Sequence, residues 1–151
     1  MTKFIFTLLT ILITQHAMAQ NKKVVFVCEH GAAKSVIAAA YFNKLAKERN
    51  LNYEAVCRGN VPDAEVSPSA KEGLMKDKIF DDAVTPTKLM IDHTVNTERI
   101  ILFTKLPSDF KTSIKTEDWS NLKDLDGDYQ HRREAITKSI NSLLDTLSKQ
   151  K

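Results

Sequence analysis

The chain has 151 residues, of which 27% are charged, and a formal net charge of +3; this length suits one folded domain. Lysines and acids are interspersed, and no basic stripe with interleaved aromatic residues occurs, which argues against a nucleic-acid binder. Two cysteines are too few for a disulfide-stapled scaffold, so their reactivity is the better reason to consider them.

Residues 1–19 have the pattern of a secretory signal peptide. Lys3 gives a charged start, an apolar stretch runs from Phe4 to Ile13, and positions 17–19 form an A-x-A cleavage pattern. A membrane helix needs about 20 apolar residues, so the stretch is too short for a stable membrane anchor. We therefore expect a single mature domain over residues 20–151 that is periplasmic or secreted.

Continuous runs of β-branched and aromatic residues predict strands that are buried on both faces of a parallel sheet. A weaker extended stretch spans Ile79–Val84, and a short segment around Trp119 is a candidate final strand. The strong runs are Lys22–Cys28, Tyr53–Cys57 and Arg99–Thr104.

Helical spacing and capping residues predict helices between and after these strands. Ser67 is a plausible N-cap with Pro68 at the first helical position, which predicts a helix to about Lys76. Strands alternating with helices predict an open, three-layer α/β fold of about four parallel strands, with helices on both faces. The other expected helices are Ser35–Arg49, a short one after Thr85-Pro86-Thr87 through Leu89 and Met90, and a last one with the stripe Ile136, Ile140, Leu143, Leu144 and Leu147.

Cys28 lies at the carboxyl end of the first predicted strand, followed by the loop EHGAA and then by Lys34 and Ser35. Ligands of open parallel sheets bind at this edge. Converging backbone N–H groups and a helix N-terminus form an anion-binding nest, and the same field favours the thiolate form of cysteine. The stretch therefore predicts a site that binds an oxyanion and holds a nucleophile against it.

VVFVCEHGAAKS, at Val24–Ser35, resembles the phosphate-binding loop of the low-molecular-weight protein tyrosine phosphatases and the thioredoxin-linked arsenate reductases. That loop has a cysteine, five residues, an arginine and a serine or threonine. CRGNVPDAEVSPSAKEGL, from Cys57, is similar to the second strand, turn and helix of this family. The stretch from Trp119 to Ile136 is similar to its acid-bearing loop and last helix, so the resemblance covers nearly the whole mature chain.

The resemblance implies a phosphomonoester hydrolase of the protein tyrosine phosphatase type. Cys28 would attack phosphorus and form a thiophosphate intermediate, Ser35 would hydrogen-bond the departing thiolate, and Lys34 would help hold the oxyanion. The general acid would be an aspartate before the last helix; Asp124 is favoured by its spacing from Trp119, with Asp126 close behind. Asp128 is the third possibility. The substrate-binding residues would be Glu29, His30, Gly31, Ala32 and Ala33.

Several positions depart from the family pattern. Lys34 replaces an arginine whose planar fork grips two phosphate oxygens, which predicts weaker binding of the transition state. Gly31 replaces the usual loop asparagine, and no proline follows a candidate catalytic aspartate. Glu29 fits an anion site only if its side chain points outward.

Cys57 follows the second predicted strand and is a possible redox partner of Cys28, although a buried core residue is the slightly favoured interpretation. The thioredoxin-linked arsenate reductases use two further cysteines downstream, and none follows Cys57. The alternatives to an exported phosphatase are therefore an arsenate reductase-like thiol redox protein and a non-catalytic oxyanion-binding member of the family.

No cofactor or metal site is expected. His93 and His131 have no partners at ligand spacing, and KDLDGDY does not have the glycine and glutamate positions of a calcium loop. The expected partner is a phosphorylated protein or a small phosphoester, and no feature indicates an oligomeric state.

Overall fold

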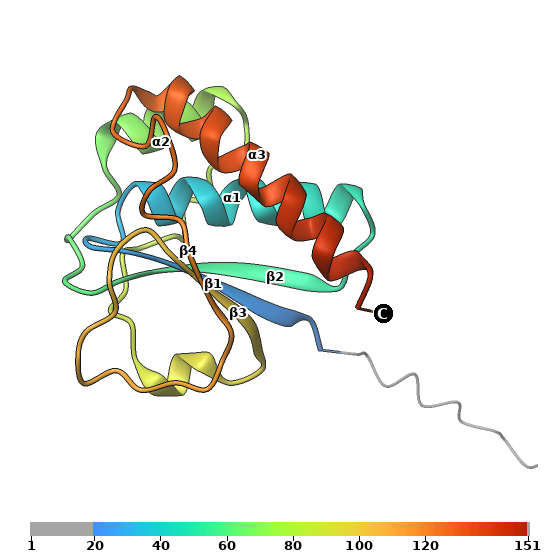
Figure 1. Ribbon diagram of the computed structural model, residues 1–151. Coiled ribbons are helices and arrows are strands. Elements are labelled where there is room, and N and C mark those ends of the chain that lie inside the picture. The colour runs from blue at the N-terminus through green and yellow to red at the C-terminus, as the bar shows by residue number, and fades with distance from the viewer. Residues whose placement is uncertain (1–19, 151) are drawn as a thin grey trace, which may run out of the picture.

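The computed structural model describes residues 20–150. The predicted signal peptide, residues 1–19, lies outside this range. Within it, the chain forms a sheet of four parallel strands in the order β2-β1-β3-β4, with α-helices packed above it (Figure 1). The strands are β1 (Lys22–Cys28), β2 (Tyr53–Gly59), β3 (Thr97–Leu102) and β4 (Thr116–Asp118).

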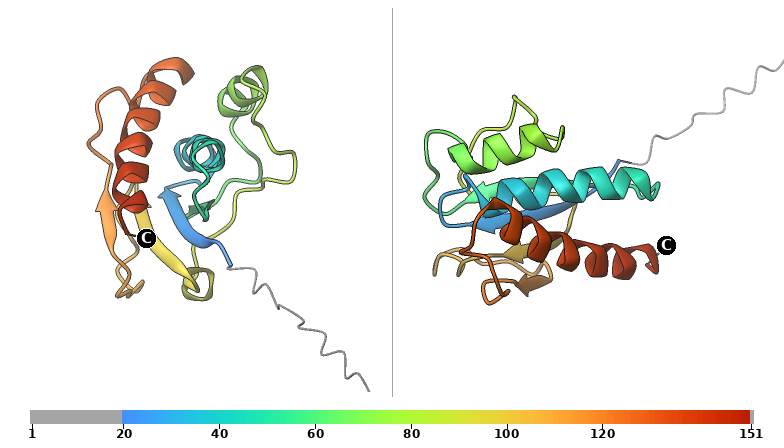
Figure 2. Two further views of the ribbon diagram at one scale, coloured as in Figure 1. Left: turned by 90° about the vertical axis from the view of Figure 1, so that its right-hand side faces the viewer. Right: turned by 90° about the horizontal axis from the view of Figure 1, so that it is seen from above.

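The helices are α1 (Lys34–Glu48), α2 (Pro68–Lys76) and α3 (Tyr129–Ser148), together with the 3-10 helix η1 (Ile91–Thr94). Capping residues fix two helix starts, because the Ser67 hydroxyl accepts a hydrogen bond from the N–H of Ala70, and Asp128 caps α3. Seen from above, α2, α1 and α3 lie side by side in that order over the sheet (Figure 2).

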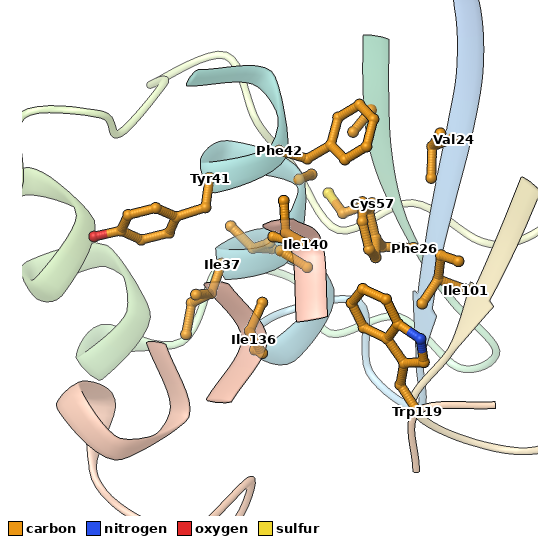
Figure 3. Packing of buried hydrophobic residues seen from close by; sticks show 14 of the residues in the cluster. Val24, Phe26, Ile37, Tyr41, Phe42, Cys57, Ile101, Trp119, Ile136 and Ile140 are labelled. Atoms are coloured by element: carbon orange, nitrogen blue, oxygen red, sulfur yellow. The ribbon is translucent and has the colours of Figure 1, made fainter. Parts of the chain in front are cut away.

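The main core lies between these three helices and one face of the sheet. Phe26 of β1 is fully buried and packs against the rings of Phe42 and Trp119, whose centroids are 5.8 and 5.9 Å away (Figure 3). The ring of Phe103 is stacked 6.4 Å from it. The apolar stripe of α3 completes this layer, as its spacing predicts. The residues of that stripe are Ile136, Ile140, Leu143, Leu144 and Leu147.

A second, smaller core covers the opposite face of the sheet. Val25, Val27 and Ile100 pack there against Leu89 and against partly buried side chains from the loop after β3. The open parallel α/β sheet is confirmed. The helical layer expected on the second face is reduced to η1 and loops, because all three α-helices pack on the first face (Figure 1).

Two short elements differ from the sequence-based expectation. Ile79–Val84 is not a strand: the N–H of Ile79 closes the end of α2 on the carbonyl of Leu74, and the N–H of Val84 turns back to the carbonyl of Asp81.

The short helix expected through Leu89 and Met90 is also wrong. The N–H of Leu89 donates to the Gly59 carbonyl (2.8 Å), and the N–H of Gly59 donates to the Thr87 carbonyl (2.9 Å). These two hydrogen bonds form a β-bridge between Lys88 and Gly59 and hold residues 87–89 extended. Helical structure therefore begins only at Ile91. No helix among residues 20–150 is long and apolar enough to cross a membrane.

Candidate active site

The loop between β1 and α1 is held by the loop that follows β2. Its carbonyl groups turn toward that neighbour and accept four backbone hydrogen bonds of 2.9–3.3 Å. The donor and acceptor pairs are Asn60 to Cys28, Val61 to Glu29, Asp63 to His30 and Ser67 to Ala32.

The backbone N–H groups of the same loop have no hydrogen-bond acceptor in the described chain. Within residues 20–150, none of the N–H groups from Glu29 to Ala33 donates a hydrogen bond to the protein. The N-cap of α1, Ala33, has no side-chain acceptor for the first helical N–H groups either. Successive N–H groups without partners beside a helix N-terminus have the arrangement that suits an anion.

Gly31 and Gly59 let two backbones approach closely at this loop. Gly31 has φ +61°, and a Cβ placed on it would lie 2.9 Å from the backbone nitrogen of Gly59. A Cβ on Gly59 would lie 2.7 Å from the nitrogen of Gly31. The family resemblance implies an asparagine at position 31. Glycine suits this position for two reasons: the backbone is left-handed, and the close approach of Gly59 leaves no room for a side chain.

Cys28 and Ser35 face each other across the loop. The Cys28 Sγ lies 3.1 Å from the Ser35 Oγ, and both residues are buried. Cys28 is the last residue of β1 and Ser35 the second of α1, so the sheet and helix together fix their separation. The hydroxyl is positioned to donate a hydrogen bond to a thiolate.

Lys34 forms an ion pair with Asp126, whose carboxylate oxygen lies 2.9 Å from the Lys34 Nζ. The Asp126 side chain is 95% exposed, whereas that of Lys34 is 28% exposed. The hydrogen bond and the positive charge of Lys34 hold the pKa of Asp126 below its ordinary value. The contact joins the start of α1 to the loop before α3.

The other two aspartates of KDLDGDY have different environments. Asp128 is the N-cap of α3 and accepts a hydrogen bond from the N–H of His131 (3.0 Å), which holds its pKa below the ordinary value. Asp124 is exposed and has a left-handed backbone, with φ 67°. Of the three, Asp126 is thus the one that contacts Lys34 at the start of α1, although the spacing from Trp119 favours Asp124.

Glu29 and His30 both point to neighbouring loops. The Glu29 carboxylate accepts hydrogen bonds from the Asn60 side chain (3.3 Å) and the Thr104 hydroxyl (3.0 Å). His30 Nδ1 lies 3.3 Å from the Asp63 carboxylate. Asn60, Asp63 and Thr104 are missed by the sequence reasoning, because nothing in their local pattern marks them. Only the adjacency of strands β2, β1 and β3 brings them to the site.

Cys57 lies on β2, where it pairs with Phe26, while Cys28 pairs with Gly59. Both cysteines are buried free thiols on the same face of the sheet. A two-residue offset between neighbouring strands separates their Cα atoms by about 8 Å, beyond the roughly 7 Å that a disulfide spans. Burial raises the pKa of the Cys57 thiol above its ordinary value. The geometry supports the core interpretation of Cys57 over the redox-partner one.

No group of three or more histidine, cysteine or acidic side chains in residues 20–150 has the arrangement of a metal site. The groups that the described site brings together are a thiol, a hydroxyl, an ammonium group, a carboxylate and backbone N–H groups.

No protein-family profile and no curated protein matches this sequence. Solved structures do match it. YfkJ from Bacillus subtilis superimposes with a TM-score of 0.75 at 18% identity, over 89% of this chain and 99% of its own. A low-molecular-weight protein tyrosine phosphatase from B. subtilis gives 0.71 at 19% identity, over 84% and 97%. The chain has the low-molecular-weight protein tyrosine phosphatase fold.

The arsenate reductases share this fold. The thioredoxin-dependent arsenate reductase of Corynebacterium glutamicum gives a TM-score of 0.69 at 22% identity over 89% of this chain, which spans 65% of that enzyme. The arginine phosphatase YwlE, solved with a phosphorylated active-site serine, gives 0.73 at 18% identity over 84% of this chain and 96% of its own. The resemblance seen in the sequence is thereby confirmed at the level of the fold.

Proposed function

We propose that the protein is an exported, cysteine-dependent phosphatase that hydrolyses a phosphomonoester through Cys28. The observation that carries this proposal is the 3.1 Å contact between Cys28 Sγ and Ser35 Oγ, at a loop whose N–H groups have no partner in the described chain. The arrangement joins a nucleophile, a donor to its thiolate and an oxyanion cradle.

In the first step the Cys28 thiolate attacks phosphorus, and the bond from phosphorus to the leaving oxygen breaks. Loop N–H groups and Lys34 hold the equatorial phosphoryl oxygens. Asp126 gives its proton to the leaving oxygen, so the alcohol or phenol departs neutral. The product is a Cys28 thiophosphate and the Asp126 carboxylate.

In the second step a water molecule attacks the thiophosphate, and Asp126 takes one of its protons. The bond between sulfur and phosphorus breaks, inorganic phosphate leaves, and the Ser35 hydroxyl donates a hydrogen bond to the released thiolate. The first step is supported by YwlE, which has the same fold: its cysteine-to-serine mutant was solved with a phosphorylated active-site serine.

The ion pair between Lys34 and Asp126 links acid catalysis to binding. Lys34 holds the pKa of Asp126 low in the free protein. When Lys34 turns to a phosphoryl oxygen, Asp126 loses that partner and its pKa returns upward, which favours the protonated acid at the moment a leaving group needs it.

Arsenate reduction is the second candidate, because arsenate is an oxyanion that fits the same cradle and arsenate reductases share the fold. It requires a further thiol to release the arsenic from Cys28. The only other cysteine of the chain is Cys57, and its buried position in the sheet argues against this role. An external thiol would have to supply the reduction.

The test is hydrolysis of an aryl phosphate by the reduced domain, residues 20–151, compared with Cys28→Ser. We expect turnover that the serine change lowers by roughly 10³-fold or more. Absence of turnover in the parent protein, together with thiol-dependent reduction of arsenate, would reject the phosphatase in favour of the redox alternative. Export is tested separately, by N-terminal sequencing of the protein recovered outside the cytoplasm, where cleavage after Ala19 is expected.

A further inference from the structure

A cleft of about 740 Å³ opens beside the loop between β1 and α1. Leu89 and Phe110 of the smaller core line it, so it lies on the face of the sheet opposite to α3. Its walls come from the loop after β2, the segment from Lys88 to Asp92 and the loop after β3. Glu29, the residue that follows Cys28, lines the cleft together with Asn60. The cleft therefore adjoins the proposed phosphate site at Glu29.

The mouth of the cleft carries an unusual share of exposed apolar side chains. Five large apolar side chains among residues 20–150 are exposed, and three of them line this cleft. They are Val61, Met90 and Ile91, which are 63%, 50% and 60% exposed. A gathering of such side chains around a concavity is typical of a binding surface rather than of a solvated one.

Glu29 gives the cleft a negative charge close to the nucleophile. Neutral donors from Asn60 and Thr104 hold its carboxylate, and no cation within residues 20–150 forms an ion pair with it. A carboxylate that is held by neutral donors and has no ion-pair partner, next to the proposed oxyanion site, disfavours ligands that are negative throughout. It favours a ligand with a cationic group beside its phosphate.

Asp92 and Asp109 add to the negative charge of the cleft, and Lys88 and Lys105 oppose it. Three carboxylates against two ammonium groups leave the lining slightly acidic. The cleft thus offers both apolar side chains and an excess of carboxylates, and one ligand must satisfy both.

Building on the proposed phosphatase activity, we propose that this cleft binds the polypeptide that flanks a phosphorylated residue, and that it selects a basic residue with an apolar one beside it. Glu29 pairs with the basic side chain, and Val61, Met90 and Ile91 cover the apolar one. A small phosphoester fills the phosphate cradle but leaves the cleft empty, so Glu29 determines specificity among phosphopeptides.

The test measures binding directly, with Cys28→Ser as a trap, so that it does not depend on turnover. Fluorescence anisotropy is recorded with three labelled phosphotyrosine peptides of equal length: one flanked by lysine and leucine, one by glutamate and leucine, and one by lysine and serine. We expect the lysine and leucine peptide to bind about tenfold more tightly than either of the others, a difference of about 1.4 kcal/mol.

Variants in the trap background assign the preference to residues. Glu29→Gln keeps acceptors for Asn60 and Thr104 but removes the charge, and should shrink the lysine over glutamate preference to less than about twofold. Glu72→Gln, an exposed acid on α2, is its control and should leave the preference unchanged. Met90→Ser should reduce the leucine over serine preference, whereas Met75→Ser, an exposed methionine on α2, should not.

Equal affinity for the three peptides would overturn the proposal, even if aryl phosphate is hydrolysed and the phosphatase stands. A lysine preference that survives Glu29→Gln would overturn the role of this residue. The expected preferences in a protein that hydrolyses no phosphoester would support the cleft and reject the phosphatase. Binding of none of the peptides would reject the cleft, whatever the result of the turnover assay.

Discussion

The ammonium group of Lys34 lies 2.9 Å from a carboxylate oxygen of Asp126, which is 92 positions away in the sequence. This contact places the last loop of the chain over the first one. In the proposed mechanism the same cation has two partners in turn, the aspartate and a bound oxyanion, and the balance between them sets both ligand affinity and the protonation of the acid.

Asp126→Asn should lower kcat for an aryl phosphate by about 10²-fold, because the leaving oxygen then departs without a proton. Asp124→Asn is the matched control, since Asp124 forms no ion pair or hydrogen bond with Lys34 in the described structure, and it should have a much smaller effect. The pH dependence of kcat gives a second measurement. The fall in kcat as pH rises should flatten in Asp126→Asn, because the titrating acid is gone.

A larger loss in Asp124→Asn than in Asp126→Asn would reverse this assignment in favour of the spacing from Trp119. Such a result would mean that the Lys34 contact holds Asp126 away from the substrate.

Lys34→Arg should raise kcat/KM for an aryl phosphate roughly tenfold, since a guanidinium can hold two phosphoryl oxygens at once. Lys34→Met should lower it by about 10²-fold, as for the loss of one donor to a developing oxyanion. Inhibition by inorganic phosphate should follow the same order, with arginine the tightest. No change in either variant would show that the backbone N–H groups bind the oxyanion without help from the cation.

The sequence predicts the framework of the site well because its signals are local. The run VVFVC, the N-cap at Ser67 and the stripe of α3 each specify their own element, and the predicted bounds differ from the observed ones by at most a few residues. Cys28, Ser35 and the free loop N–H groups follow from a single strand, loop and helix unit.

The remainder depends on contacts between distant segments. The pairing of Lys88 with Gly59 overrides the helical pattern around Leu89, and the packing of all three α-helices on one face cannot be read from their periodicity. The contact of Asp126 with Lys34 could not be predicted either, because nothing in the sequence around Asp126 indicates that its loop reaches back to the start of α1.

Asp77 connects the three helices above the site. Its carboxylate accepts hydrogen bonds from the hydroxyls of Tyr41 (2.5 Å) and Tyr129 (2.6 Å), and Arg133 lies 3.5 Å away. Partial burial alone would raise the pKa of Asp77, but the two tyrosine donors and Arg133 outweigh it, so the pKa lies below its ordinary value. Because the folded pKa is depressed, the stabilisation is present above the unfolded value of about 3.9 and is lost as pH falls through the folded pKa.

Asp77→Asn should therefore lower the free energy of unfolding by about 1.5–3 kcal/mol at neutral pH, the range for a hydrogen bond to a charged group. The difference from the parent protein should shrink below about pH 4, where Asp77 is protonated in the unfolded chain. Urea unfolding at several pH values measures it, with the exposed Asp82→Asn as the control. A difference that stays constant down to pH 2 would show that the charge of Asp77 is not the cause.

Whether Cys57 can form a disulfide with Cys28 distinguishes the proposed phosphatase from a two-cysteine redox protein. The offset of two residues between Cys28 and Cys57 on neighbouring strands, and the burial that raises the pKa of Cys57, predict that the folded protein forms no internal disulfide. After treatment with diamide and removal of the reagent, mass spectrometry of the intact protein should show no species that has lost two hydrogens. Cys57→Ala should keep its aryl phosphate turnover, at a cost of about 1 kcal/mol in stability for the lost sulfur. Two results together would favour the redox function instead: an internal disulfide that forms readily in the folded parent protein, and arsenate reduction that Cys57→Ala abolishes. The disulfide would require the ends of β1 and β2 to shift.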